Sequence, residues 1–471
     1  MDSTTLREYR QALYACVTRA GDALFEVADA LLTTAHPRAF IELSQAPSFR
    51  RGWPSLYAAF RDGQIDRVAL RRLFACHAPR PAPGARLLLG RDTSPIHRPE
   101  ADTFADRTPV YAPNLPPGVT PTRPGWAFST LAVLPDPVSS WTYTLDNQRV
   151  PSSATATTIG AAQLAAVLPL LAERPLLVAD GHYGTATWVA ATATLPCDQL
   201  LRAKRTAVLY RPAPPRTGKR GAPRKDGARF QGSDAATHGV PDAQWAGADA
   251  RGQAVTVACW GGLHLKPRRD VPITAVRITR AGAAGTQRDP RETWFWWLGD
   301  AVPALATLPQ LYGCRFGIEH GDKFDKQALL WAAPRLRSPA QMERWTDLVA
   351  AVHNQLVLAR PLATIAHRPW ESAARPHTPQ QVRRRVPAAA GGGADYCPGR
   401  DTRPPAPTTR EITRTRTGHR HPPGCAAAGD PQASAQGRLV EHGNAWRTSC
   451  RATARGAATS QPRPPPCRAC Q

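Results

Sequence analysis

ARLLLGRD (residues 85–92) and RPLLVADGHYG (residues 174–184) decide the fold class of this chain. Both contain a short, continuous apolar run, which is the pattern of a strand buried on both faces. An acidic residue follows each run, Asp92 in the first stretch and Asp180 in the second. Because open α/β sheets place their chemistry at the carboxyl ends of such strands, these two aspartates are candidate functional residues. Taken singly, each aspartate also fits the simpler role of a turn or cap residue.

The sequence between and after these stretches predicts a mixed sheet. Residues 125–134 and 139–150 are rich in β-branched and aromatic side chains, and residues 157–171 form an apolar helical stretch that carries Gln163. The order strand, strand, strand, helix, strand indicates an α/β fold in which helices cover the sheet. Strand-like segments return at residues 254–260.

Residues 2–75 have apolar side chains at helical spacing and are predicted to be helical. Six arginines lie in the later part of this region: Arg50, Arg51, Arg61, Arg67, Arg71 and Arg72. A basic helical module in front of a catalytic domain is typical of a DNA-binding region. The same pattern fits a solvated charged face equally well.

The chain as a whole is strongly basic. It has 471 residues with 60 Lys plus Arg against 36 Asp plus Glu, a net charge of +24. At about 100 to 200 residues per domain, this length predicts two or three domains. The charge favours a polyanionic partner, most commonly nucleic acid, because each cation set against a phosphate releases a condensed counterion. A basic ribosomal or membrane-surface protein would share the charge.

The composition changes abruptly near residue 386. Residues 387–471 contain 12 Arg and 12 Pro, but only three residues among Ile, Leu, Val and Phe. Such a segment cannot bury enough apolar surface to offset its chain entropy, so we expect it to be disordered. A frameshift in a GC-rich gene would produce the same change. The spacing of Cys467 and Cys470 resembles a zinc-ligand pair, but no second pair accompanies it.

The sequence also predicts the compartment. The first residues, MDSTTLREYRQ, contain no apolar signal region, and the longest apolar run, residues 159–171, is too short to cross a bilayer. The cysteines before residue 386 are isolated from one another, which fits buried thiols in a reducing compartment better than a disulfide framework. We therefore expect a cytoplasmic protein.

The stretch LYGCRFGIEHGDKFDK (residues 311–326) is predicted to be a helix with a polar face. Four of its residues lie at offsets of 0, 3, 7 and 14: Tyr312, Arg315, Glu319 and Lys326. At about 100° per residue, these side chains fall within roughly 60° of one another. A core helix would carry Leu, Ile or Val there. This face instead offers a metal ligand, two cations and a phenol, which suits a phosphate held beside a metal ion.

This spacing, with LLLGRDTS (residues 87–94) and LLVADGHYG (residues 176–184), resembles the Y-R-E-K signature group of DDE transposases from bacterial insertion sequences. The resemblance implies an α/β fold with an RNase H-like mixed sheet flanked by helices, a helical N-terminal region and a largely β insertion before Glu319. It also implies cleavage of DNA at the ends of a mobile element and transfer of the freed 3′-hydroxyl to target DNA. The partners would be double-stranded DNA, as terminal inverted repeats and target, and a second copy of the chain on paired ends in a bacterial cytoplasm.

The resemblance also assigns roles to residues. Asp92, Asp180 and Glu319 would be the catalytic acids that hold two divalent ions, Mg²⁺ or Mn²⁺. The phosphate-binding residues would be Tyr312, Arg315 and Lys326. Some relatives stack a flipped base on a tryptophan of the insertion, for which this chain offers Trp294, Trp296 and Trp297, although packing against the core explains this cluster at least as well.

The resulting domain prediction has five parts. They are a helical, DNA-binding region at 1–80, the first part of the core at 81–210, a basic loop with the β insertion at 211–300, the helical closing part of the core at 301–385, and the tail at 386–471. Two features depart from the family pattern. Asp322 and Asp325 add negative charge beside the site, and Gly317 and Gly321 weaken the helix by about 1 kcal/mol each relative to Ala.

Two other functions remain open at this point. A copy that has lost catalysis could act only as a DNA-binding protein, and the tail of foreign composition favours that interpretation. An RNase H-like nuclease would differ from a transposase only in lacking the step that joins the 3′-hydroxyl to new DNA.

Overall fold

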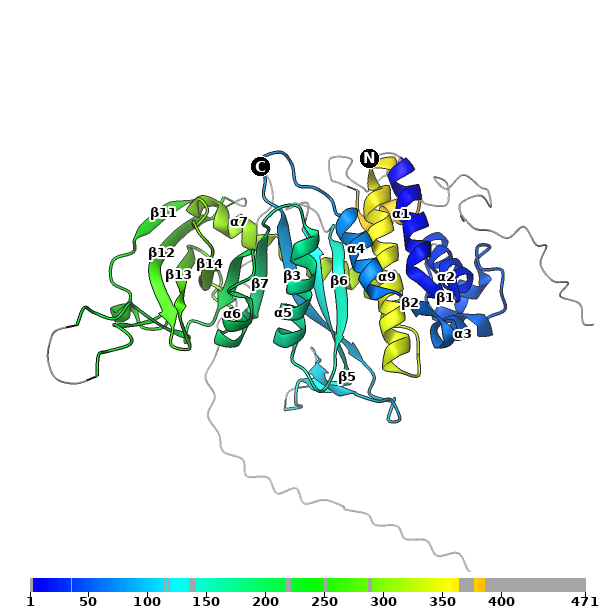
Figure 1. Ribbon diagram of the computed structural model, residues 1–471, viewed down its shortest axis with the longest axis horizontal. Coiled ribbons are helices and arrows are strands. Elements are labelled where there is room, and N and C mark those ends of the chain that lie inside the picture. The colour runs from blue at the N-terminus through cyan, green and yellow to red at the C-terminus, as the bar shows by residue number, and fades with distance from the viewer. Residues whose placement is uncertain are drawn as a thin grey trace, which may run out of the picture. The chain divides into compact units, whose positions relative to one another are not determined.

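A large mixed sheet forms the centre of the molecule in a computed structural model of the chain (Figure 1). The structure describes residues 3–34, 36–112, 115–116, 118–134, 141–216, 222–249, 252–286, 290–363 and 377–385. These residues belong to one compact unit, Met1–Asp401. The predicted tail at 386–471, with Cys467 and Cys470, lies outside the described residues.

Five strands make up the part of the sheet that carries the two aspartates. They are β3 (Leu88–His97), β5 (Thr122–Val133), β6 (Tyr143–Val150), β7 (Leu176–Gly184) and β8 (Asp198–Ala203). Strand β3 pairs antiparallel with β5, which pairs antiparallel with β6. On its other side β3 pairs parallel with β7, and β7 pairs parallel with β8. This confirms the predicted mixed α/β architecture and is compatible with an RNase H-like fold.

Seven further strands extend the same sheet. They are β4 (Thr108–Tyr111), β9 (Val208–Tyr210), β10 (Arg229–Gln231), β11 (Ala243–Ala248), β12 (Ala254–Leu265), β13 (Arg268–Arg280) and β14 (Glu292–Leu298). Strand β14 pairs antiparallel with β8, and β13, β12 and β9 follow outward from it. The β-rich region predicted at 211–300 therefore continues the core sheet through hydrogen bonds, instead of forming a sheet of its own.

Helices cover both faces of the sheet. They are α1 (Ser3–Cys16), α2 (Gly21–Thr33), α3 (Pro54–Asp62), α4 (Arg67–Cys76), α5 (Ala156–Val167), α6 (Ala186–Thr192), α7 (Leu308–Gly313), α8 (Phe316–Gln327), α9 (Pro339–Ala359) and α10 (Pro379–Arg383). The short 3₁₀ turns are Phe40–Gln45, Leu168–Leu170, Ala235–Thr237, Leu305–Thr307 and Arg360–Leu362, and a two-stranded ribbon joins β1 (Val17–Arg19) to β2 (Gln64–Ile65). No helix in the described part of the chain has the length and apolar character needed to cross a membrane.

Strand alternation divides the apolar residues between two core clusters. Leu89 and Leu177 belong to the cluster that includes residues of α5, α6 and α9. Their neighbours Leu88 and Leu176 belong to the cluster that includes residues of α7 and α8. Because successive side chains of a strand point to opposite faces, even-numbered residues of β3 and β7 near these positions lie on the α8 face.

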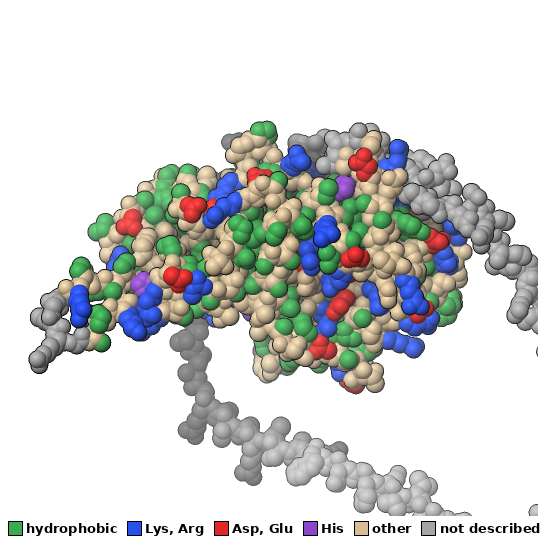
Figure 2. Space-filling view, in the orientation of Figure 1, with side chains coloured by type: hydrophobic (Ala, Val, Ile, Leu, Met, Phe, Trp, Pro, Cys, Tyr) green, Lys and Arg blue, Asp and Glu red, His purple; other side chains and the backbone are tan. Residues whose placement is uncertain are grey.

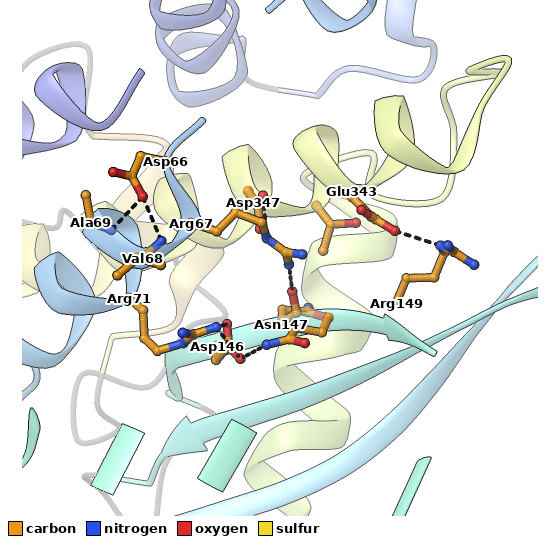
Figure 3. A network of polar contacts seen from close by, with 12 residues as sticks. Asp66, Arg67, Val68, Ala69, Arg71, Asp146, Asn147, Arg149, Glu343 and Asp347 are labelled. Atoms are coloured by element: carbon orange, nitrogen blue, oxygen red, sulfur yellow. Dashed lines mark hydrogen bonds and ion pairs between the residues drawn. The ribbon is translucent and has the colours of Figure 1, made fainter. Parts of the chain in front are cut away.

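The helical N-terminal region is joined to the core by a network of ion pairs (Figure 3). Arg67 of α4 pairs with Asp347 of α9 at 3.1 Å and also donates to the Asn147 carbonyl of β6 at 2.7 Å. One turn later, Arg71 pairs with Asp146 of β6 at 3.4 Å. These contacts hold α4, α9 and β6 together.

Five of the six arginines singled out in this region have acidic partners within the chain. Besides the two in the network, the pairs are Arg50 and Arg51 with Glu26, and Arg61 with Asp62. On the face drawn in Figure 2, blue and red side chains are interspersed over the helical end of the molecule. Ion pairs within the chain therefore engage most of these arginines, and DNA binding by residues 1–80 stays a prediction.

Candidate active site

Asp92 and Asp180 lie side by side where strands β3 and β7 separate. The last parallel pair places Arg91 opposite Ala179, and each aspartate is the next residue along its strand. Strand alternation sets both aspartates on the α8 face of the sheet. The two short apolar runs of the sequence therefore bring their acids together, although 88 residues separate them.

The backbone after each aspartate bonds back to its carboxylate. The N–H of Thr93 donates to Asp92 Oδ1 at 2.8 Å, and the N–H of His182 donates to Asp180 Oδ1 at 3.0 Å. These bonds fix the direction of each carboxylate.

Helix α8 brings Glu319 to the same place because Gly90 lets the helix approach the sheet. A Cβ at Gly90 would lie only 2.5 Å from Cδ1 of Ile318, the residue that precedes Glu319. Ile318 itself is 1% exposed and packs in the apolar cluster between α8 and the sheet. The close contact of Gly90 with Ile318 thus sets the height of Glu319 above β3.

Arg315 joins two of the three predicted acids. Its Nη1 lies 3.1 Å from Asp92 Oδ2, and its Nη2 lies 2.6 Å from Glu319 Oε1. The side chain of Arg315 is only 7% exposed, whereas that of Glu319 is 51% exposed. Arg315 therefore acts as an internal counter-cation at the buried end of the acidic site.

The acids influence one another electrostatically. Burial raises the pKa of Asp92 to about 6, against the opposing charge of Arg315, and the negative charges of Asp180 and Glu319 raise it further. Burial works against the charged form of Arg315, but Tyr312 and then the same three carboxylates outweigh it and raise the pKa of Arg315. The site is thus a concentration of negative charge that favours a bound cation.

Lys326, at the end of α8, lies over the continuation of β3 beyond Asp92. Its Nζ donates to Ser94 Oγ at 2.7 Å and to the Pro95 carbonyl at 2.8 Å. Burial lowers the pKa of Lys326, against the charge of Asp322. Burial also raises the pKa of Asp322 to about 7, so this acid shares its environment with Lys326.

Tyr312 lies on a separate helix, which differs from the predicted single helix. Helix α7 ends at Gly313 and α8 begins at Phe316. Tyr312 is 8% exposed, and its ring meets Phe295 of β14 edge-on at 4.6 Å between centroids. The interruption follows from local bonding, since the N–H groups after Gly313 bond in the tighter pattern of a turn: Arg315 N–H donates to the Tyr312 carbonyl.

Two of the residues that depart from the family pattern, Gly321 and Asp325, have a structural role. A Cβ at Gly321 would lie 2.5 Å from Thr142 Oγ1. Next to it, Asp325 accepts from Nδ1 of the buried His353 of α9 at 2.6 Å, and Nε2 of His353 lies 3.0 Å from the Thr142 carbonyl. Burial works against the charged imidazole, but the Asp325 carboxylate outweighs it and raises the pKa of His353. Gly321 and Asp325 therefore dock α8 onto α9.

A hollow of about 620 Å³ opens beside the two aspartates. Its lining comes from β3, β4, β7 and the turn before α5, and includes Asp92, Asp180, His182 and Tyr111.

The insertion tryptophans are core residues. Trp294, Trp296 and Trp297 are 5%, 4% and 1% exposed, and all three belong to β14. The alternative of core packing is confirmed for this cluster. The basic loop at 211–229 is described only in part, because residues 217–221 lie outside the described residues.

The donor set at this site suits a hard divalent cation. Asp92, Asp180 and Glu319 supply only carboxylate oxygens, which Mg²⁺ and Mn²⁺ prefer. Within the described ranges, no three acidic, histidine or cysteine side chains are already arranged as a metal site. Arg315 instead contacts one carboxylate oxygen of Asp92 and one of Glu319, so it occupies part of the donor set that a metal ion would use.

The family follows from a comparison with protein-family models. Residues 12–264 match the model described as DDE superfamily endonuclease. The chain belongs to this family. The match includes Asp92 and Asp180 and ends before Glu319, so the third predicted acid lies outside it. A search of curated proteins finds no match to the chain. Membership implies a metal-dependent nuclease that acts on DNA.

Proposed function

We propose that the chain is a DDE transposase of the Y-R-E-K group. It cleaves phosphodiester bonds at the ends of an insertion sequence and transfers the 3′-hydroxyl ends to target DNA. Asp92, Asp180 and Glu319 hold two divalent ions, Mg²⁺ or Mn²⁺. Bound in this way, a metal pair activates the attacking oxygen and stabilises the leaving one.

One observation carries the proposal. Arg315 contacts Asp92 and Glu319 at once, although 227 residues of sequence separate these acids. A buried cation held between two carboxylates, with Asp180 on the adjacent strand, identifies a point where the fold concentrates negative charge. A simple ion pair of Arg315 would need only one carboxylate, whereas three lie together here, and burial and then the charge of Asp180 raise the pKa of Asp92.

The other residues have roles that follow from their contacts. Asp92 and Glu319 would hold the metal ions, and the Arg315 guanidinium beside them would contact a phosphate oxygen of the cleaved strand. Lys326, which bonds Ser94 and Pro95, would contact the same strand. Tyr312, whose ring centroid lies 5.9 Å from Cζ of Arg315, is the third residue proposed to bind phosphate. Replacing Arg315 or Lys326 should weaken strand transfer and lower the slope of log affinity against log salt by about one per lost phosphate contact.

The test uses DNA that carries the inverted repeats flanking the gene. We expect Mg²⁺-dependent cleavage by the unaltered chain and its loss in Asp92→Asn, Asp180→Asn and Glu319→Gln, with DNA binding retained. Asp102→Asn serves as the matched control, because Asp102 has a 90% exposed side chain and pairs only with Arg107 among the described residues. Full cleavage by Glu319→Gln would refute the assignment of the third acid.

The same assay separates the two alternatives. Adding a supercoiled plasmid tests whether the labelled 3′-hydroxyl is joined to new DNA, and cleavage without joining would identify a nuclease. The family description, endonuclease, supports that second function directly. Binding without cleavage would identify a copy that has lost catalysis, which the pairing of Arg315 with two acids argues against. Sedimentation with and without end DNA tests the proposed self-association.

A further inference from the structure

The two aspartates lie in a fork of the sheet that backbone hydrogen bonds do not close. The parallel ladder between β3 and β7 ends at Arg91 and Ala179. Further along, β3 continues its pairing with β5 alone within the described residues. Strands that diverge in this way need side-chain contacts if the residues in the fork are to keep a fixed separation.

A side-chain hydrogen bond joins the two strands beyond the fork. The hydroxyl groups of Tyr183 on β7 and Thr93 on β3 lie 2.8 Å apart. Thr93 follows Asp92 directly, and Tyr183 lies three residues after Asp180. Because Tyr183 is only 1% exposed, water does not compete strongly for this bond.

The ring of Tyr183 is itself held from behind. Cζ of Arg91 lies 5.0 Å from the ring centroid, and the ring meets that of Trp188 edge-on at 4.9 Å. A guanidinium over a desolvated aromatic face is attracted by the ring quadrupole. Arg91 and Trp188 therefore leave the tyrosine one position, with its hydroxyl toward Thr93.

Arg91 is a buried charge, and its burial costs desolvation free energy. It is 0% exposed, and no carboxylate in the described part of the chain forms an ion pair with it. Its partners are neutral: Gln163 Oε1 at 3.0 Å, the Gly160 carbonyl at 3.2 Å and the Ser129 hydroxyl. An apolar residue of similar volume would avoid the desolvation penalty of the charge.

Helix α5 is shaped around this arginine. A Cβ at Gly160 would overlap the guanidinium, so the position requires glycine. Gln163, the polar residue in an otherwise apolar helical stretch, is 0% exposed and bonds both Arg91 and Ser129. Gly160 and Gln163, which are both unfavourable in a buried helix, thus form the site that the Arg91 side chain occupies.

We propose that Tyr183 and Arg91 are positioning residues of the active site. The hydrogen bond between Tyr183 and Thr93, called the clasp below, holds β3 and β7 together beyond the point where they separate. Arg91 fixes the ring of Tyr183, so the two residues set the separation of the Asp92 and Asp180 carboxylates. This inference rests on the proposed function, since two ions about 4 Å apart tolerate little variation in the spacing of their ligands.

Tyr183→Phe tests the clasp while leaving the ring and its contacts with Arg91 in place. The matched control is Tyr9→Phe, which removes another buried tyrosine hydroxyl, bonded at 3.2 Å to the Ala351 carbonyl in the helical region. We would measure Mn²⁺ binding to the full chain by titration calorimetry, thermal unfolding, and kcat and KM for cleavage of end DNA.

We expect Tyr183→Phe to weaken Mn²⁺ binding by about tenfold or more, as changes behind metal ligands do. The kcat should fall with little change in KM, and Tm should match that of Tyr9→Phe. Thr93→Val should have the same effect, and the double variant should lose no more than either single one, because all three lack the same bond.

Two results would count against these conclusions in different ways. If Tyr183→Phe binds Mn²⁺ and turns over like Tyr9→Phe, the clasp is refuted and the proposed function stands. If the unaltered chain binds no Mn²⁺, the proposed function fails and the clasp with it.

Discussion

Gly90→Ala should separate helix α8 from the sheet and so remove Glu319 from Asp92 without changing any residue that the proposed chemistry uses. The added Cβ would lie 2.5 Å from Ile318 Cδ1 and 2.8 Å from Leu134 Cδ1. Carbon atoms make favourable contact at about 3.5 to 4.0 Å, so something must move by roughly 1 Å. Strand β3 is paired on both sides at this residue, and α8 has the greater freedom to shift.

The expected cost is that of an overpacked core, about 1 to 3 kcal/mol of unfolding free energy. Metal-dependent cleavage should fall more than stability does, because a shift of about 1 Å at a catalytic group can cost roughly a hundredfold in rate. Urea unfolding and cleavage of end DNA measure the two effects separately. Gly313→Ala in α7 is the control, since no atom lies within 4 Å of its added Cβ.

A second substitution tests the cause. Ile318→Val removes the Cδ1 atom that would clash, and alone it should cost about 0.5 to 1.5 kcal/mol. Combined with Gly90→Ala, it should restore part of the lost stability and activity, because the two residues are in contact. Leu134 remains in place, so the rescue should be partial. Additive losses in the double variant, or unchanged stability of Gly90→Ala, would refute the reasoning.

Three further predictions concern buried charges. Asp325 raises the pKa of His353, so the imidazolium should stabilise the fold below about pH 6.5, the pKa of an unfolded histidine. This contribution should be lost as pH rises through the folded pKa. In His353→Gln, urea unfolding measured from pH 5 to 9 should no longer show this loss of stability. Burial raises the pKa of Asp347 to about 7, so the protonated carboxyl favours folding, and the unfolding free energy should fall as pH rises from about 4 to 7. Asp347→Asn should flatten this dependence on pH. An unchanged dependence would contradict the raised pKa of Asp347. Arg67→Met should lower the unfolding free energy by about 3 kcal/mol at pH 8, because it leaves Asp347 buried without its ion-pair partner; combining it with Asp347→Asn should recover most of the loss, measured by urea unfolding.

The core strands could be predicted from sequence because each contains a continuous run of apolar residues, which can be recognised without knowing its partner strands. The run before Asp92 becomes the first half of β3, and the run before Asp180 becomes β7. The end of β3 could not be predicted, because residues 93–97 stay in the sheet through pairing with β5 only, despite Pro95. That pairing depends on a partner more than 25 residues away, which local periodicity does not report.

The aromatic cluster shows a related limit. Trp294 and Trp296 belong to one core cluster, and Phe295 and Trp297 belong to the other. A strand buried on both faces loses the alternation of polar and apolar residues that would identify it. The residues themselves therefore fit a binding surface or a core strand equally well, and only the pairing of β14 with β8 and β13 distinguishes them.

The candidate site divides in the same way. The contact of Arg315 with Glu319 follows from their spacing of four residues on a helix, and the sequence alone suggests it. The contact of Arg315 with Asp92 requires α8 to lie on β3, which depends on Gly90 and Ile318, neither of which belongs to the signature. Thr93, Tyr183 and Arg91 are equally hidden. The one sequence signal for them is Gln163, an amide in an apolar helix, which shows that something polar lies beneath without identifying it.

Net charge is a weaker guide to DNA binding in this protein than the total of +24 suggests. Most of the arginines singled out in the helical region pair with acids of the chain, and the charge of Arg91 is buried inside the fold. Counterion release counts only cations that meet phosphates, so the buried Arg91 adds to the formal charge and not to affinity. Arg315 is different, because its present partners are the acids that a metal would take over. In the proposed function its charge would become available to DNA when metal binds, and we would then expect metal and DNA to strengthen each other's binding at this site.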